Sequence, residues 1–144
     1  MMIVLGSTGY IGSKFVNFFD ALGYEAMGVS RSEVYYTNPE TLRSWLKSRN
    51  PRLIINSAGY TGKPNVDACE LAKAECLSGN AVLPGVIREV CEDLNIPWGH
   101  VSSGCIFSGR RQDGKGWTEE DDPNFSFRSL PCSFYSGTKA LGEE

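Results

Sequence analysis

Hydrophobic positions form two kinds of segment that follow one another along this chain. Short, unbroken apolar runs predict buried strands, and longer stretches with apolar residues three or four positions apart predict helices with one apolar face. Strands that alternate with helices predict an α/β fold, a doubly wound parallel sheet with right-handed crossovers. The predicted strands are residues 2–5, 24–29, 53–55 and 97–103, and the predicted helices are residues 13–22, 39–50, 65–94 and a helix that begins near Tyr135.

The first predicted strand runs directly into three glycines spaced three residues apart. Gly6 allows a sharp turn out of the strand, Gly9 lets the backbone approach a ligand, and Gly12 lets the next helix pack closely on the strand. Such a place suits a pyrophosphate, which binds the free N–H groups at the N-terminus of a helix that begins near Tyr10. The same spacing occurs in ordinary loops, so the residues that follow must decide between the two interpretations.

The residues after the glycines supply the context that a pyrophosphate site needs. Residues 13–22 have a wide apolar face, Gly23 is typical of the position after a helix end, and residues 24–29 form the second predicted strand. Strand, glycine turn, helix and strand together are the opening unit of a Rossmann-type dinucleotide-binding domain.

The end of the second strand indicates which dinucleotide binds. An acidic residue usually stands there to bind the ribose hydroxyls of NAD, but this chain has Ser30, Arg31 and Ser32, with no carboxylate before Glu33. A guanidinium can bind phosphate through two parallel hydrogen bonds. This favours NADPH over NADH, although an Arg31 on a solvated loop is the alternative.

A long helical pattern covers residues 65–94, with Asn65 as a plausible cap. Pro84 and Gly85 are expected to bend or divide this helix. Asn80 lies near the inner face, where it either supports the active site or marks the helix break. Three cysteines fall on the apolar stripe and are interpreted as small core residues, namely Cys69, Cys76 and Cys91.

Composition limits the remaining possibilities. The chain has 144 residues, which fits one domain, and its net charge of -3 gives no reason to expect nucleic acid or an anionic membrane as partner. No apolar run approaches a membrane span and no leader pattern opens the chain, so we expect a cytoplasmic protein. Five scattered cysteines and the single His100 argue against a disulfide framework and a zinc site. His100 is interpreted as a satisfied residue on a buried strand.

Small and hydroxyl-bearing residues follow the third and fourth strands, at residues 56–59 and 102–105. The carboxyl ends of strands are where an open α/β sheet receives its ligand. The acidic run at residues 119–122 is interpreted as solvated, because no other ligand candidates flank it. Residues 109–116 mix glycine with charge and predict an exposed loop.

Tyr135 and Lys139 are four residues apart, which places both on one face of a helix. A nearby ammonium favours phenolate, so Lys139 is expected to lower the pKa of Tyr135 and suit it to proton transfer at neutral pH. The pair is a weak signal alone. It becomes strong beside a nucleotide-binding start and a hydroxyl at the end of a strand.

Together, the glycine turn, Ser103 and the Tyr135–Lys139 pair resemble the extended short-chain dehydrogenase/reductases that act on nucleotide sugars. The interior of the chain is more specific. It resembles the epimerase-reductase part of plant-type nucleotide-rhamnose synthases, which are related to bacterial dTDP-4-dehydrorhamnose reductase. The segments that carry this second resemblance are residues 58–70, 104–107, 123–125 and 133–136.

The resemblance implies NADPH-dependent reduction of a nucleotide-linked 4-keto-6-deoxyhexose, with 3,5-epimerisation, in the synthesis of L-rhamnose. By this resemblance, Tyr135 donates a proton to the reduced oxygen and Ser103 donates a hydrogen bond to the ketone oxygen. Lys139 binds the ribose of the nicotinamide, and Cys105 acts as acid or base in epimerisation. A buried strand-end cysteine is the alternative for Cys105. The implied cofactor-binding residues are Gly6, Thr8, Gly9, Tyr10, Ile11, Gly12, Ser30, Arg31, Ala58, Gly59, Tyr60, Tyr135 and Lys139.

Sugar-nucleotide dehydratases of this superfamily typically place Asp-Glu after the active-site hydroxyl, as acid and base for removing water. Gly104 and Cys105 follow Ser103 here, so the resemblance argues against dehydration. It leaves open a UDP or a dTDP sugar, NADH as a second cofactor, and a homodimer.

Length is the main departure from the family, whose members are roughly twice this size. Residues 1–144 are therefore expected to be the NADP-binding Rossmann domain of an extended short-chain reductase, without the C-terminal substrate subdomain. Tyr135 and Lys139 would then lie on a frayed helix end. The alternative is a complete, non-catalytic module that binds NADP(H) or a partner.

Overall fold

The computed structural model describes residues 1–144, which form two compact units. The first unit contains residues 1–59 and 83–101, and the second contains residues 60–82 and 102–144. No helix is long and apolar enough to span a membrane.

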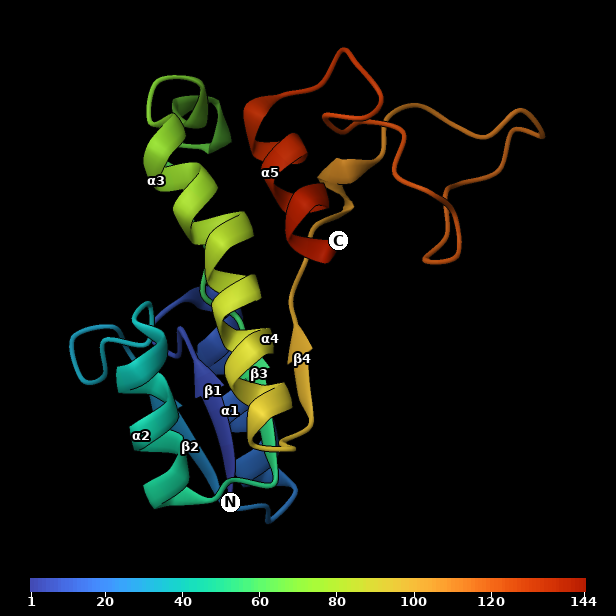
Figure 1. The fold of residues 1–144 in the computed structure, drawn as a ribbon. Helices are drawn as coiled ribbons and strands as arrows, with labels where there is room; N and C mark the ends of the chain where they lie inside the picture. Colours follow the sequence, from blue (N-terminus) through green and yellow to red (C-terminus); the bar gives the residue numbers. More distant parts are fainter. The chain divides into compact units, whose positions relative to one another are not determined.

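The first unit is built on a four-stranded parallel sheet (Figure 1). Its strands lie in the order β2-β1-β3-β4, so β2 lies on one side of β1, and β3 and β4 lie on the other side. Ligands of open sheets bind at such a switch point, outside the carboxyl ends of the strands. The four strands are β1 (Met2–Leu5), β2 (Ala26–Val29), β3 (Leu53–Asn56) and β4 (Trp98–His100).

All four predicted strands are present, but β4 is shorter than the predicted range 97–103. Its ladder with β3 ends where Asn56 pairs with His100, because β3 itself ends at Asn56. Val101 still donates a backbone hydrogen bond to Asn56, at 2.9 Å, and residues 102 and 103 have left the sheet. The predicted hydroxyls at 102 and 103 therefore lie beyond the strand.

Helices cover both faces of this sheet, as predicted for a doubly wound fold. Helix α1 (Tyr10–Ala21) lies on one face, and α2 (Pro39–Arg49) and α4 (Leu83–Asp93) lie on the other (Figure 1). Asn38 caps α2 by accepting a hydrogen bond from the Thr41 N–H at 2.8 Å, and Asn50 ends it in the left-handed conformation.

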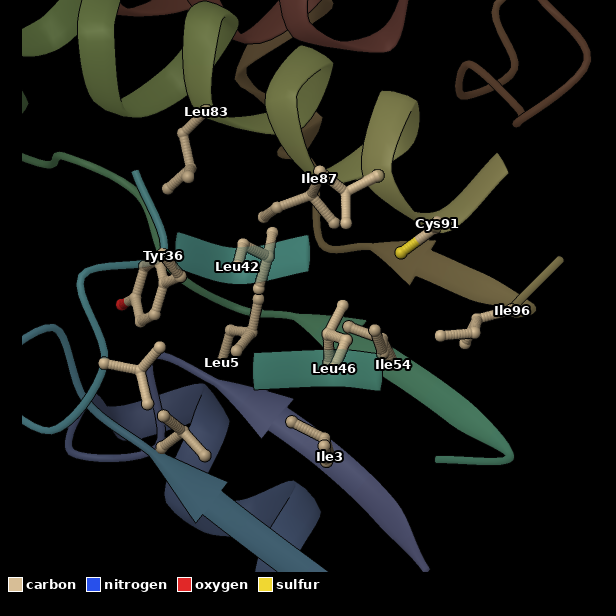
Figure 2. Close-up of a cluster of buried hydrophobic side chains, with 13 residues drawn as sticks. Ile3, Leu5, Tyr36, Leu42, Leu46, Ile54, Leu83, Ile87, Cys91 and Ile96 are labelled. Carbon is tan, nitrogen blue, oxygen red and sulfur yellow. The ribbon is translucent and has the colours of Figure 1, made fainter. Parts of the chain in front are cut away.

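The main core lies between the sheet and the pair α2 and α4 (Figure 2). Side chains of successive strand residues point to opposite faces, so Ile3 and Leu5 share this core while the buried Val4 faces α1. Leu42 and Leu46 of α2 are fully buried in the same cluster, which also includes Ile87 and Cys91 of α4.

In the second unit, the helical pattern predicted from residue 65 is interrupted earlier than the predicted bend at Pro84 and Gly85. Asn65 is a cap, accepting a hydrogen bond from the Asp67 N–H at 3.0 Å, but the helix that follows is the short 3-10 helix η1 (Val66–Glu70). After a break come α3 (Lys73–Leu77) and a π turn, η2 (Ser78–Val82), which leads to α4 of the first unit. Pro84 follows the π turn closely, as expected where a residue without an N–H interrupts the helical ladder.

Helix α5 (Phe134–Glu143) and the 3-10 helix η3 (Gly104–Ile106) complete the second unit. The expected frayed end at Tyr135 and Lys139 is wrong, because residues 135–140 are all buried. The predicted loop at residues 109–116 is confirmed as mostly exposed. In the acidic run, Asp121 accepts hydrogen bonds from Thr118 and from Arg111.

Candidate active site

The glycine turn has the geometry that its spacing predicts. Gly6 has a φ of +76°, a backbone conformation that residues with a side chain rarely adopt. A Cβ at this position would lie 2.6 Å from the Ala58 nitrogen. Gly12 is buried, and a Cβ there would lie 2.6 Å from the Ser57 hydroxyl and closer still to the Gly6 carbonyl. Both positions therefore require glycine, because backbone and helix approach each other too closely for a larger residue.

The N-terminus of α1 is open to a ligand. The first intrahelical hydrogen bond runs from the Ser13 N–H to the Gly9 carbonyl, at 3.0 Å, so the N–H groups of Tyr10, Ile11 and Gly12 precede the helical ladder. Thr8, Gly9, Tyr10 and Ile11 are exposed. These N–H groups and the positive end of the helix dipole suit a pyrophosphate.

The carboxyl end of β3 is held by buried polar contacts that the sequence interpretation did not single out. Asn56 is fully buried, accepts a hydrogen bond from the Ala58 N–H at 3.0 Å, and lies 3.0 Å from a ring nitrogen of His100. The Ser57 hydroxyl donates to the Leu5 carbonyl at 2.6 Å. His100 is thus a satisfied strand residue, as predicted, and Ala58 is held beside Gly6.

At the end of β2 the structure adds a contact that the sequence interpretation missed. The Glu33 carboxylate accepts hydrogen bonds from the Ser30 N–H at 2.7 Å and from the Ser30 hydroxyl at 2.6 Å. These bonds hold the pKa of Glu33 below its ordinary value, so the carboxylate is ionised at neutral pH. Arg31 is exposed and forms no salt bridge, whereas Ser30 is already occupied.

The second unit brings three of the four predicted catalytic residues together. Tyr135 lies in α5, and its side chain shares a hydrogen bond with Ser103. Cys105 lies close enough to influence the pKa of Tyr135. The predicted lowering of the Tyr135 pKa is wrong for this structure. Burial raises the pKa of this phenol, and the hydrogen bond with Ser103 offsets only part of the rise. Tyr135 is therefore fully protonated at neutral pH.

Lys139 lies one helical turn after Tyr135 and is only 4% exposed. Burial lowers the pKa of its ammonium, and the Glu143 carboxylate opposes that change. A buried lysine on the same helix face as the phenol is the arrangement that the spacing of the two residues predicts.

The three cysteines that the sequence predicts as core residues are buried, whereas Cys105 is not. Cys69, Cys76 and Cys91 are fully buried free thiols, and burial raises the pKa of the Cys91 thiol to about 12. Cys105 is exposed in η3, so the alternative of a buried strand-end cysteine is wrong. Cys105 is the most exposed of the five thiols, and Cys132 is partly exposed.

Thiol labelling should reproduce this division. We expect an alkylating reagent at neutral pH to modify Cys105 first and to modify Cys69, Cys76 and Cys91 at least about 100-fold more slowly, because buried thiols react only when the structure opens. Timed labelling followed by peptide mass spectrometry measures the four rates. Labelling of Cys76 as fast as Cys105 would contradict the described burial.

Asn80 is a buried structural link rather than a mere helix break. Its side chain accepts a hydrogen bond from the Tyr60 N–H at 2.8 Å and donates to the Tyr60 carbonyl at 2.9 Å. It also donates to the Thr138 hydroxyl, at 3.3 Å. Asn80 therefore ties the loop at Tyr60 to α5, between the positions of Tyr135 and Lys139.

A cavity of about 370 Å³ opens beside Ser103 in the second unit. Phe107 and Trp117 line it as a stacked pair with ring centroids 5.7 Å apart. Glu119 and Glu143 add carboxylates to the lining. An apolar ring surface with hydrogen-bond acceptors beside a hydroxyl suits a polar ligand with a hydrophobic face, such as a sugar.

A family model described as the RmlD substrate binding domain matches residues 1–144. The chain belongs to this family. The predicted resemblance to nucleotide-sugar reductases is thereby confirmed.

Known relatives of this RmlD-family chain are longer proteins. A trifunctional UDP-glucose 4,6-dehydratase/UDP-4-keto-6-deoxy-D-glucose 3,5-epimerase/UDP-4-keto-L-rhamnose-reductase of Arabidopsis thaliana is 36% identical over 99% of the chain. A bifunctional dTDP-4-dehydrorhamnose 3,5-epimerase/dTDP-4-dehydrorhamnose reductase of the same plant is 33% identical, also over 99%. The chain spans 21% and 46% of the length of these two relatives.

Solved structures show the same fold. The L780 UDP-rhamnose synthase of Acanthamoeba polyphaga mimivirus matches 99% of the chain with a TM-score of 0.82 and 23% identity. The match covers 50% of that synthase. The predicted Rossmann-type parallel sheet is thus confirmed for this RmlD-family chain.

Proposed function

We propose that this chain supplies the cofactor-binding and proton-donating residues of an NADPH-dependent reductase that acts on a nucleotide-linked 4-keto-6-deoxyhexose. The observation that carries the proposal is the grouping of Ser103 with Tyr135, one helical turn from the buried Lys139. The names of the relatives support the substrate class, because they include UDP-4-keto-L-rhamnose and dTDP-4-dehydrorhamnose reductases.

The residues of the first unit fit a dinucleotide. The cradle formed by Gly6 and Gly12 has no room for a Cβ, and the first two residues of α1, Tyr10 and Ile11, are exposed. When bound there, NADPH supplies the hydride that reduces the sugar ketone. The chain holds the pyrophosphate at the N-terminus of α1 and offers Arg31 to the phosphate on the adenosine ribose.

The residues of the second unit would supply the proton that the reduced ketone oxygen takes up. Tyr135 carries a proton at neutral pH and donates it to the oxygen that becomes a hydroxyl, while Ser103 donates a hydrogen bond to the same oxygen. Lys139 binds the nicotinamide ribose and stabilises the phenolate left behind. We propose that the thiol of Cys105, which is exposed, exchanges a proton with a sugar carbon in 3,5-epimerisation.

The test is the consumption of NADPH by the protein at its natural length, given UDP- or dTDP-linked 4-keto-6-deoxyglucose. We expect loss of the absorbance of NADPH together with a rhamnose nucleotide as product. Deuterium from solvent should enter the sugar at carbons 3 and 5 if Cys105 acts in epimerisation. A protein that binds NADPH but leaves it unoxidised with both sugars would contradict the proposal.

Cofactor preference provides a separate prediction. Arg31→Ala should weaken NADPH binding about 10- to 100-fold and change NADH binding little, because it removes charge-assisted hydrogen bonds to one phosphate. Glu33→Gln should strengthen NADPH binding, because the Glu33 carboxylate carries like charge beside that phosphate. Titrations with both cofactors measure the change.

A suitable control for these variants is Arg52→Ala, since Arg52 is exposed and precedes β3 at the opposite end of the strand. This variant should bind both cofactors as the wild type does. Equal weakening of NADPH binding by Arg52→Ala and Arg31→Ala would mean that net charge, rather than a phosphate contact, sets the affinity.

A further inference from the structure

The start of α5 is held by a carboxylate from a distant part of the sequence. Glu70, the last residue of η1, accepts a hydrogen bond from the Phe134 N–H at 2.7 Å. Phe134 is the first residue of α5 and directly precedes Tyr135. The contact therefore joins η1 to the helix that carries the proposed proton donor, one residue before it.

This hydrogen bond gives the Phe134 N–H an acceptor, which the helix itself cannot supply. The first N–H groups of any α-helix lack intrahelical acceptors. In α5 the Ser133 hydroxyl accepts from the Ser136 N–H at 3.0 Å, and Glu70 accepts from Phe134. A carboxylate at this end also interacts favourably with the helix dipole.

The Phe134 side chain is held at the same place. The Lys73 ammonium lies 5.3 Å from the centre of its ring, and the Phe127 ring meets it edge-on with centroids 5.5 Å apart. Phe127 also lies against Gly137, where a Cβ would come within 2.5 Å of the ring. Glu70, Lys73 and Phe127 thus fix both the backbone and the ring of Phe134.

We propose that Glu70 is a positioning residue for Tyr135, holding the first turn of α5 so that the phenol stays beside Ser103. The inference rests on the proposed function and deepens it. Tyr135 is the second residue of α5, and a helix turns by about 100° per residue, so loss of the first turn would redirect the Tyr135 side chain. Glu70 contacts the backbone N–H of Phe134, so we expect its effect on Tyr135 to be geometric.

The test compares Glu70→Ala, Glu70→Gln and Glu75→Ala, the last being a control at an exposed carboxylate of α3. Hydrogen exchange at the amides of Phe134 and Tyr135 should be about 10-fold faster in Glu70→Ala, since the lost bond is charge-assisted. The kcat for NADPH oxidation should fall by a similar factor, with KM for NADPH unchanged. Glu70→Gln keeps an acceptor oxygen and should retain most of kcat, with the pH profile of the wild type.

Two results would overturn the inference. One is wild-type exchange in α5 together with wild-type kcat in Glu70→Ala. The other is equal loss of kcat in Glu70→Gln and Glu70→Ala, which would assign the effect to charge. If the wild type does not oxidise NADPH, the proposed function fails instead, and exchange at Phe134 still decides whether Glu70 holds the helix.

Discussion

Replacing Tyr135 with phenylalanine is expected to lower kcat for sugar-ketone reduction about 100- to 10,000-fold, the range for loss of a positioned general acid. The ring and its packing in the cluster with Cys69 and Cys76 are retained, and only the hydroxyl that meets Ser103 is lost. NADPH affinity should change little. Steady-state kinetics and cofactor titration on the same preparation measure both quantities.

Tyr24→Phe is the matched control for this experiment. Tyr24 is 57% exposed and lies in the first unit, before β2, so loss of its hydroxyl should leave kcat unchanged. Normal turnover by Tyr135→Phe would remove Tyr135 from the reaction. A parallel loss of NADPH binding would instead assign the phenol a role in holding the cofactor.

Gly12→Ala is expected to destabilise the first unit and to weaken cofactor binding. The new methyl group would meet the Ser57 hydroxyl and the Gly6 carbonyl, and overpacking of this kind costs about 1–3 kcal/mol of the free energy of unfolding. The melting temperature should fall by about 3–10 °C. Dinucleotide affinity should fall at least about 10-fold, because α1 must move away from the turn that cradles the pyrophosphate.

Gly85→Ala provides the opposite control in the same unit. A Cβ at Gly85 would meet nothing within 4 Å, and the residue lies inside α4. Alanine should therefore stabilise the protein by about 0.5–1 kcal/mol, because it removes backbone freedom from the unfolded chain. A Gly12→Ala variant as stable as Gly85→Ala, with normal cofactor affinity, would contradict the close approach described at Gly12.

The elements of the first unit could be predicted from the sequence because each has a strong local signal. The glycine turn has a fixed spacing, and the apolar runs 2–5 and 53–55 are too short for helices. The region 65–94 was harder. Its apolar period is helical throughout, but the break at residues 71 and 72 and the π turn before Pro84 depend on contacts such as Asn80 with Tyr60, which periodicity does not encode.

The candidate site shows the same division. Tyr135, Lys139 and Ser103 were predictable because their residue types and spacing carry chemistry. Glu70 and Glu33 were not, because an acidic residue at the end of a short helix or on a loop is ordinary until its acceptor role is known. The direction of the Tyr135 pKa was missed because burial outweighs a charge inferred from spacing alone.

The raised pKa of Tyr135 also bears on the pH range over which the proposed proton donor would stay loaded. The proposed ketone reduction would need the phenol protonated, and burial extends that form to higher pH than an exposed tyrosine would keep it. The site would therefore keep a transferable proton into the alkaline range, where an exposed tyrosine would already have lost it.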